Sequence, residues 1–285
     1  MDTPIALITG ANKGIGYHTA SLLGARGHTV LLGCRDPQRA AEAENSLCET
    51  GADAHALVLD VTDDSSIQQA AEQITERYQR LDVLVNNAGI AGAAIPKGES
   101  TPEALRRMLE TNVVGPVAMI EAMLPLLHRS PAGRIVNVSS EVGSIGSTLD
   151  PNSPLWQMPA GIPYPTSKTA LNMVTAMYAK RLWDTPIKVN AANPGYCATD
   201  LNGHTGFRTP EQAPRSSSTS PPSATTAPPA SYGATCGPTK AQTKAVYCPG
   251  SHPAPTPDRL CHRPLGTEDS HAARRSYAQP TSASQ

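Results

Sequence analysis

The sequence has no CxxC pair, no apolar run of transmembrane length and almost no net charge, and each absence excludes a class of protein. Six scattered cysteines favour free thiols over disulfides or zinc, so we expect no metal. The start of the chain lacks the basic residues and long apolar core of a signal peptide. A formal net charge of −1 indicates neither nucleic acid nor an anionic membrane as a partner. These features predict a cytoplasmic protein.

The end of the chain has few aliphatic residues. From Gln212 to Gln285 there are twelve prolines, and Val246, Leu260 and Leu265 are the only Val, Leu or Ile residues. Such a segment buries too little apolar surface to offset the entropy lost on ordering, so we predict a low-complexity, disordered tail over 212–285 and one folded domain over 1–211. The abrupt change after Glu211 suggests a frameshift, and a genuine disordered linker or interaction tail is the alternative.

Apolar runs and amphipathic stretches alternate through the first two thirds of the chain. This alternation predicts right-handed βαβ units and an α/β fold with a Rossmann-type, doubly wound parallel sheet. Beyond the two N-terminal strands, we expect strands at Ala54–Leu59, Val83–Val85, Arg134–Val138 and Ile187–Ala191. We expect helices near Gln38–Glu49, Ser65–Tyr78, Pro102–Leu127 and Ser167–Trp183. Ligands of such sheets bind beyond the carboxyl ends of the strands.

A glycine-rich turn follows the apolar run Ile5–Ile8, which is typical of a buried parallel strand. The turn opens a helix to about Arg26. Its glycines let the backbone approach a pyrophosphate, and the helix N-terminus faces that negative charge. A plain strand–turn–helix with flexible glycines is the alternative. The predicted cofactor contacts in this turn are Thr9, Gly10, Asn12, Lys13, Gly14, Ile15 and Gly16.

The second strand, beginning at Thr29, ends where enzymes that use NAD place an acid for the ribose 2′-hydroxyl. That slot holds Cys34, followed by Arg35, and Lys13 lies in the glycine turn. Two cations and a missing acid suit a 2′-phosphate, so we expect NADP(H) as the preferred cofactor, with NAD(H) possible. Asp36 either replaces the missing acid or caps the next helix, and we favour capping.

Tyr164 and Lys168 lie four positions apart at a predicted helix start, so both side chains face one cleft. A free tyrosine has a pKa of about 10, too high for a general base near neutral pH, and a neighbouring ammonium favours the phenolate. We therefore predict that Tyr164 is an acid–base group and that a partly desolvated Lys168, aided by cofactor charge, lowers its pKa. The alternative, a surface pair on an ordinary helix, is disfavoured by the other motifs.

These motifs, in this order, resemble the short-chain dehydrogenase/reductase family over about Thr3 to Gly206. The positions of Lys13 and Arg35 are most similar to those of its NADPH-dependent carbonyl reductases. The resemblance implies that Asp60 binds the adenine amino group, that Asn86–Gly89 lines the adenine ribose, and that Pro194–Thr199 contacts the nicotinamide. The further cofactor contacts that it implies are Asp60, Val61, Asn86, Ala88, Gly89, Tyr164, Lys168, Pro194, Gly195 and Thr199.

The resemblance also implies catalytic roles. Ser140, rather than Ser139, orients the substrate carbonyl, Tyr164 donates the proton, and Lys168 holds the nicotinamide ribose. Asn112 positions a water in a proton relay; otherwise it kinks or caps a helix. The serines otherwise satisfy backbone groups at a strand end. The implied activity is hydride transfer between NADP(H) and a carbonyl or alcohol of a small molecule. The alternative is a catalytically impaired nucleotide-binding protein or sensor.

Two departures from the family bear on the substrate and on assembly. The segment between Ser140 and Tyr164 is longer than usual and carries Leu155, Trp156, Met158 and Ile162 as apolar anchors, so we predict a substrate lid, with a surface excursion as the alternative. The final helix and strand of the family have no counterpart in the sequence. We therefore expect a sheet without its usual last strand, a possible homodimer through the helices 102–127 and 167–183, and a doubtful tetramer.

Overall fold

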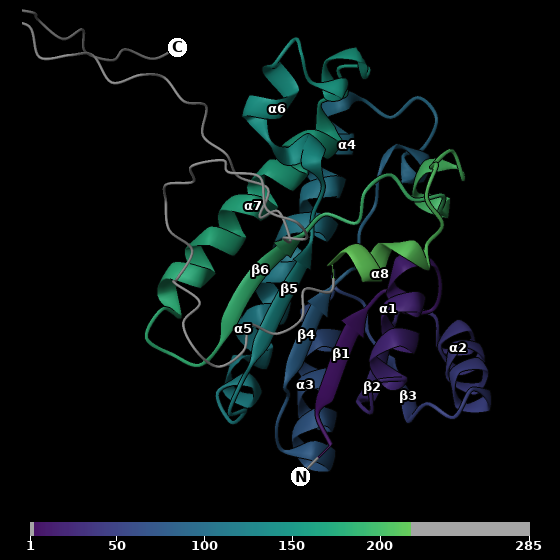
Figure 1. The fold of residues 1–285 in the computed structure, drawn as a ribbon, viewed down its shortest axis with the longest axis vertical. Helices are drawn as coiled ribbons and strands as arrows, with labels where there is room; N and C mark the ends of the chain where they lie inside the picture. The colour runs from purple at the N-terminus through teal and green to yellow at the C-terminus, as the bar shows by residue number, and fades with distance from the viewer. Residues whose placement is uncertain (1–2, 218–285) are drawn as a thin grey trace, which may run out of the picture. The chain divides into compact units, whose positions relative to one another are not determined.

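The computed structural model describes residues 3–217, so most of the predicted tail lies outside the described residues. Six strands form one parallel sheet in the order β3-β2-β1-β4-β5-β6 (Figure 1). No strand follows β6 within residues 3–217. The predicted doubly wound sheet is therefore confirmed. The strands are β1 (Ile5–Thr9), β2 (Thr29–Cys34), β3 (Ala54–Val58), β4 (Val83–Asn86), β5 (Arg134–Val138) and β6 (Lys188–Ala192).

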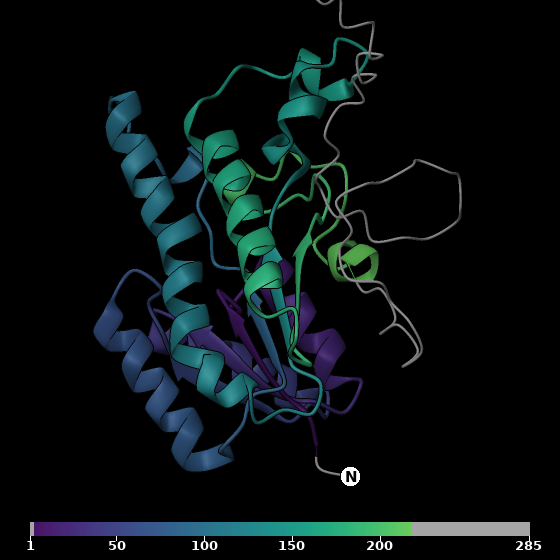
Figure 2. The ribbon, with the colours of Figure 1, turned by 90° about the vertical axis from the view of Figure 1, so that its left-hand side faces the viewer.

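Helices cover both faces of the sheet (Figures 1 and 2). On one face, Ile8 and Leu32 pack with residues of α1 and α2, and on the other, Leu7 packs with α3, α5 and α7. All residues of β1 and β2 are buried, because each side of these central strands is covered. Burying a leucine side chain contributes about 1.5–3 kcal/mol. The helices on these faces are α1 (Gly14–Gly24), α2 (Pro37–Glu49), α3 (Asp64–Tyr78), α5 (Gly115–Leu127) and α7 (Pro163–Arg181).

The stretch predicted as one helix over Pro102–Leu127 consists of three segments. Helix α4 (Thr101–Leu109) runs into a single π-helical turn, η2 (Glu110–Val114), before α5 begins. A π turn inserts one extra residue into the helical repeat, and such turns are frequent at functional sites. Pro125 lies inside α5. The periodicity of the sequence predicts the helical face but not the inserted residue.

Short elements connect the strand ends at the carboxyl edge of the sheet. Parallel pairing brings the ends of β1, β2, β4 and β5 to this edge; for example, Asn86 of β4 pairs with Asn137 of β5. The loops that follow therefore share one side of the molecule. They contain η1 (Gly92–Ala94), η3 (Glu141–Gly143), α6 (Ile145–Leu149), η4 (Pro154–Gln157) and η5 (Asp200–Asn202).

Helix α8 (Gln212–Ser217) lies inside the segment predicted to be disordered. It packs against α1 (Figure 1). Ala213 is fully buried, and the Arg208 guanidinium donates a hydrogen bond to the carbonyl of Gln212 at 3.1 Å. A six-residue helix thus begins the segment that the sequence analysis gives as the tail. Composition does not predict this helix, because a residue as small as Ala213 makes its buried contact.

Candidate active site

The glycine turn has the backbone conformation that glycine permits. Gly10 and Gly14 have φ of 65° and 58°, in the left-handed region that other residues rarely adopt. A Cβ on Gly16 would lie 2.5 Å from both the Gly10 carbonyl oxygen and Nδ2 of Asn87. The first two glycines of the turn are thus required by their backbone conformation and the third by close packing, as a phosphate-binding turn demands.

Asn87, which the sequence analysis gives only as part of the segment Asn86–Gly89, holds the glycine turn in place. Its Nδ2 donates to the carbonyls of Thr9 and Gly10 at 2.9 and 3.1 Å, and its backbone N–H donates to Thr9 Oγ1 at 3.0 Å. These bonds hold the glycine turn against the end of β4. The motif Asn86-Asn87-Ala88-Gly89 pointed to this region, but the individual contacts predicted in it were those of Asn86, Ala88 and Gly89.

The side chain of Asn86 points into the interior. It is 3% exposed, and its Nδ2 donates to Asn137 Oδ1 at 2.8 Å. Asn137 in turn donates to Thr175 of α7 at 2.9 Å. This buried chain of amides ties β4, β5 and α7 together. The Asn86 side chain therefore supports the fold, and any contact of this residue with a cofactor falls to its backbone.

The N-terminus of α1 is open to an anion. Its N-cap residue, Lys13, makes no side-chain capping bond, and the first turn contains no acidic residue. The first amides of a helix lack intrahelical acceptors, and the helix dipole adds partial positive charge there. A phosphate group fits this position by charge and by hydrogen bonding. The turn thus fits the pyrophosphate of a dinucleotide.

The exit of β2 presents a cation and no free acid. Asp36 Oδ1 accepts from the backbone N–H groups of Gln38 and Arg39 at 3.0 and 3.2 Å, which confirms the predicted helix cap. Burial raises the pKa of the Cys34 thiol to about 11, so it stays neutral at physiological pH. Arg35 is exposed. This arrangement suits a phosphate on the ribose better than a free 2′-hydroxyl.

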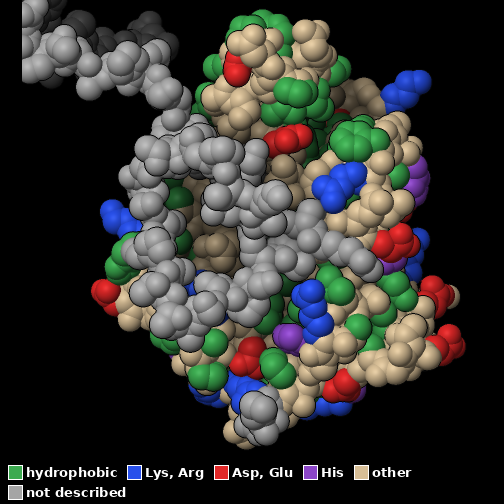
Figure 3. All heavy atoms as spheres, in the orientation of Figure 1, with side chains coloured by type: hydrophobic (Ala, Val, Ile, Leu, Met, Phe, Trp, Pro, Cys, Tyr) green, Lys and Arg blue, Asp and Glu red, His purple; other side chains and the backbone are tan. Residues whose placement is uncertain are grey.

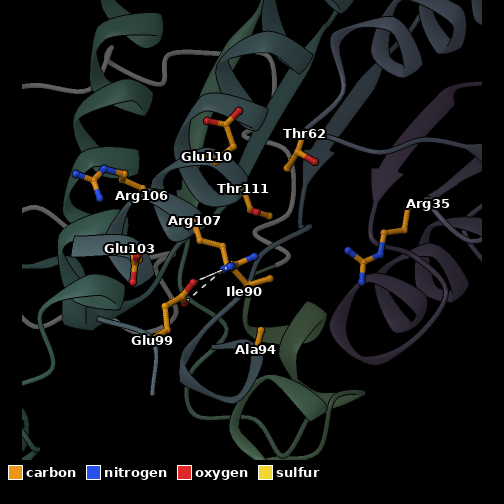
Figure 4. A pocket seen from close by; sticks show the side chains of 10 residues that line it. All are labelled: Arg35, Thr62, Ile90, Ala94, Glu99, Glu103, Arg106, Arg107, Glu110 and Thr111. Carbon is orange, nitrogen blue, oxygen red and sulfur yellow. Dashed lines mark hydrogen bonds and ion pairs between the residues drawn. The ribbon is translucent and has the colours of Figure 1, made fainter. Parts of the chain in front are cut away.

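A cleft of about 820 Å³ opens beside Arg35 (Figure 4). Arg35 lies on one side of it, and Ile90 and Arg107 lie on the other, with Arg107 bound to Glu99 at 2.6 Å. At the strand end beside the cleft, Asp60 Oδ1 accepts from the backbone N–H and hydroxyl of Thr62, at 2.9 and 2.7 Å. The wall residues are Arg35, Thr62, Ile90, Ala94, Glu99, Glu103, Arg106, Arg107, Glu110 and Thr111.

Tyr164 and Lys168 lie together at the start of α7. The Lys168 Nζ is 5.7 Å from the centre of the Tyr164 ring and donates to the carbonyl of Val138 at 2.8 Å. Lys168 is 6% exposed, and burial lowers its pKa to about 8. Burial raises the pKa of Tyr164 to about 12, and a hydrogen bond with the Ser140 side chain offsets this only in part.

The effect of Lys168 on the Tyr164 pKa, which the sequence analysis expects with the aid of cofactor charge, stays a prediction. Desolvation of the buried phenol is the largest cause of its raised pKa. Tyr164 is a protonated phenol at neutral pH, which is the form needed to donate a proton to a carbonyl oxygen.

The two serines after β5 face different ways. Ser139 is buried, and its hydroxyl donates to Asn172 Oδ1 at 2.6 Å. Ser140 is partly exposed, interacts with Tyr164, and accepts a weak hydrogen bond from the backbone N–H of Val142 at 3.4 Å. Ser140, and not Ser139, therefore has a hydroxyl beside the phenol.

Asn112 lies in the π turn, and its side chain is committed to neighbouring groups. Its Oδ1 accepts from the N–H of Ile90 at 2.8 Å, and its Nδ2 donates to the Ile90 carbonyl and to Ser167 Oγ, at 2.9 and 3.0 Å. Both amide hydrogens are used. The side chain thus joins the loop after β4 to α7, directly behind the Tyr164–Lys168 pair.

The loop after β6 crosses over the glycine turn. A Cβ on Gly14 would lie 3.6 Å from the Thr199 methyl group, and Gly195 has φ of 77° with the Arg208 side chain packed against it. Lys13, predicted to meet a 2′-phosphate, forms an ion pair with Asp200 of this loop. Of the predicted residues from Pro194 to Thr199, Thr199 therefore lies against the glycine turn.

Comparison with known proteins identifies the family. The family model for short chain dehydrogenases matches residues 4–207. This chain belongs to the short-chain dehydrogenase family. These proteins are oxidoreductases, and the match ends just before α8.

Relatives and solved structures resemble the chain over about three quarters of its length. The short-chain dehydrogenase anuI of Penicillium roqueforti is 38% identical over 220 residues, which cover 74% of this chain and 86% of that protein. An NADPH-bound carbonyl reductase from chicken fatty liver is 31% identical, with a TM-score of 0.66, over 76% of this chain and 90% of that one. Salutaridine reductase from Papaver somniferum is 27% identical, with a TM-score of 0.63, over 74% and 93%.

The part of this short-chain dehydrogenase that the structure describes shows no cluster of three or more His, Cys, Asp or Glu residues suited to a metal. In residues 3–217, no helix combines the length and the apolar character needed to cross a bilayer.

The segment predicted as a lid exposes apolar side chains that were expected to be buried. Trp156, Met158 and Ile162, which we expected to anchor it, are 49%, 47% and 58% exposed. Apolar side chains gather on the part of the surface that carries α6 (Figure 3). The segment is thus not fixed by a buried Trp156, and it presents apolar side chains between two proposed catalytic residues, Ser140 and Tyr164.

Lys168 should lower the stability of this short-chain dehydrogenase at neutral pH. Its pKa is about 8 in the folded protein against 10.5 for a free lysine, so the folded state binds its proton less tightly. The difference corresponds to about 3 kcal/mol. We expect Lys168→Met to raise the free energy of unfolding at pH 7. The wild type should recover this difference as the pH rises from about 8 towards 10.5, where only the unfolded lysine remains protonated.

Denaturant unfolding of both proteins across this range measures the effect. Lys180→Met, on the exposed end of the same helix, is the control; it keeps Lys168, so its stability should rise over this pH range as that of the wild type does. A Lys168→Met variant that is less stable than the wild type at pH 7 would contradict the prediction.

Proposed function

We propose that this protein transfers a hydride between NADP(H) and a carbonyl or alcohol group of a small molecule. The observation that carries the proposal is the grouping of Ser140, Tyr164 and buried Lys168 at the ends of β5 and α7. This group lies on the same edge of the sheet as the glycine turn, whose geometry suits a pyrophosphate. The complete cluster favours turnover over a role in nucleotide binding alone.

In the proposed reduction, the hydride for the carbonyl carbon would come from bound NADPH. Ser140 orients the carbonyl oxygen through its hydroxyl, and the protonated phenol of Tyr164 donates the proton that completes the alcohol. With a pKa of about 12, the Tyr164 phenolate is unfavourable at neutral pH, so it must be stabilised once the proton has left. Lys168, close to the ring, stabilises the phenolate by its positive charge, in addition to holding the nicotinamide ribose. Oxidation of an alcohol follows the same path in reverse.

Asn112 has a supporting role in this proposal. Its side-chain amide hydrogens bind Ile90 and Ser167, so the amide group positions the loop and the start of α7. We assign the relay water, which would return a proton towards Lys168, to the backbone carbonyl of Asn112 rather than to its side chain. The π turn supports this assignment, because it disturbs the regular hydrogen bonding of the helix.

The function is tested by following NADPH oxidation with a panel of aldehydes and ketones. The exposed apolar lid favours apolar carbonyl compounds within this panel. We expect measurable turnover with at least one of them. NADPH binding without turnover of any substrate in either direction would favour the nucleotide-binding alternative.

Arg35→Ala should weaken NADPH binding selectively. The exposed guanidinium at the exit of β2 has no neighbouring free acid and suits a 2′-phosphate. A charge-assisted contact contributes about 1.5–3 kcal/mol, so the dissociation constant for NADPH should rise at least about tenfold while that for NADH changes little. Calorimetric titration with both cofactors measures this. The control is Arg26→Ala, an exposed arginine beyond α1. Equal affinity of the wild type for the two cofactors would contradict NADP(H) preference.

The proposal also covers the bounds of the domain and the assembly of the protein. We propose that residues 1–211 form the NADP(H)-binding domain and that residues 212–285 form a tail, with α8 at its start packed against the domain. Met173 and Met177 on α7 are exposed, as is Val114 in the π turn. These apolar residues support a homodimer through the two long helices. A tetramer is doubtful, because no strand follows β6 within the described residues.

A further inference from the structure

Lys13 of the glycine turn is held by a carboxylate from a distant part of the chain. Asp200, which begins η5, lies 187 positions further along, and its Oδ2 accepts from the Lys13 ammonium. The other carboxylate oxygen, Oδ1, is 2.7 Å from Nε2 of His204. Lys13 and His204 together hold the pKa of Asp200 below its usual range. Asp200 is thus an ionised group with two partners.

The loop that carries Asp200 is built to present it. Thr199 and Asn202 form a capping box, and Asn202 Nδ2 donates to the Cys197 carbonyl at 2.9 Å. The backbone N–H of His204 donates to the Thr199 carbonyl at 2.9 Å. His204 has φ of 62°, directly after Gly203 with φ of 63°. A left-handed conformation is uncommon for a non-glycine residue and is kept only where surrounding contacts enforce it.

A recess beside Lys13 is the second feature around its side chain. Lys13 lines a recess of about 380 Å³ between the glycine turn and α2, together with Asn12, Tyr17 and Arg39. Arg35 leaves β2 just before this helix. A phosphate on the 2′-position of the adenosine ribose belongs at this strand exit. From the sequence we expect a 2′-phosphate against Lys13 and Arg35, so the Lys13 ammonium has two candidate partners, the Asp200 carboxylate and the 2′-phosphate.

We propose that Asp200 competes with the 2′-phosphate of NADP(H) for Lys13 and so determines how strongly this protein prefers NADP(H) over NAD(H). The inference rests on the proposed cofactor and goes beyond it, because it assigns a residue that weakens binding of the preferred one. A 2′-phosphate draws Lys13 away from Asp200 and releases the contact between the glycine turn and the loop of Thr199. NAD(H) has no such phosphate and leaves the ion pair intact.

The test measures dissociation constants of the full chain and its Asp200→Asn variant by calorimetry. The ligands are NADPH, NADH, adenosine 2′,5′-bisphosphate and adenosine 5′-monophosphate. The last two lack nicotinamide, so they separate the phosphate effect from any effect of the loop on the nicotinamide end. Exposed ion pairs are weak, so we expect Asp200→Asn to bind NADPH and the bisphosphate about two- to fivefold more tightly. Binding of NADH and the monophosphate should not change.

Two controls separate competition from a general change of charge. Glu211→Gln removes one negative charge near the same loop, where Glu211 lies 3.8 Å from His18 and not against Lys13. It should leave all four constants unchanged. Lys13→Met should weaken NADPH binding, and adding Asp200→Asn to Lys13→Met should then have no further effect. The loss of the Asp200 effect in this background is the signature of competition for one ammonium.

Unchanged or weaker NADPH binding by Asp200→Asn would overturn the proposal. An equal gain for NADPH and NADH, or a gain that persists without Lys13, would also overturn it, while leaving the proposed function intact. A wild-type chain that binds neither NADPH nor the bisphosphate would instead refute the proposed function, and the competition with it.

Discussion

Tyr164→Phe should abolish carbonyl reduction while leaving NADPH binding nearly intact. The ring that packs beside Lys168 is kept, and only the hydroxyl that donates the proton is lost. General acid catalysis contributes roughly a hundred- to ten-thousandfold, so kcat should fall by at least about a hundredfold. The dissociation constant for NADPH should stay within about twofold of the wild-type value. Initial rates with any accepted carbonyl substrate, and calorimetric titration with NADPH, measure the two quantities.

Tyr178→Phe is the matched control on the same helix. The Tyr178 hydroxyl donates to Glu121 at 2.5 Å, and burial, with help from Glu121, raises its pKa to about 12. It thus resembles Tyr164 in ionisation but binds a partner on α5 instead of Ser140. Its loss should leave kcat close to that of the wild type. Undiminished turnover by Tyr164→Phe, or an equal loss in both variants, would refute the assignment of Tyr164 as the acid.

Gly16→Ala should damage both the stability of the fold and its affinity for NADPH. The added Cβ would lie 2.5 Å from the carbonyl oxygen of Gly10 and from the Asn87 amide that holds the turn. Neither group moves easily, because the oxygen belongs to the backbone and Asn87 is bound to both Thr9 and Gly10. Overpacking of this kind costs about 1–3 kcal/mol. A similar cost in binding corresponds to a loss of roughly tenfold or more in affinity.

Thermal unfolding and NADPH titration of Gly16→Ala measure these losses. Gly92→Ala is the control, because a Cβ at Gly92 meets no atom within 4 Å and its φ is not positive. That variant should match the wild type in both measurements. The role given to the glycine turn fails if Gly16→Ala behaves like Gly92→Ala.

Local patterns in the sequence determined the sheet, the glycine turn and the Tyr164–Lys168 pair. Each depends on a short-range requirement: burial on both faces of a strand, a positive φ in a turn, or a four-residue spacing on a helix. The same holds for Asp36, whose position just before Pro37 predicts the helix cap that the structure confirms. Such requirements act within a few residues, so they can be recognised without knowing the rest of the fold.

The tertiary structure alone decided which of two neighbours does which task. Asn86 and Asn87 are chemically identical, and only the direction of their side chains at the end of β4 sends one into the interior and the other to the glycine turn. Lys13 forms an ion pair with Asp200, which lies 187 positions further along the chain. Helix α8 packs against α1, although its composition does not favour a folded segment. The high pKa of Tyr164 is also collective, because it results from desolvation by many surrounding groups. These properties depend on contacts between residues far apart in the chain, and no local pattern encodes them.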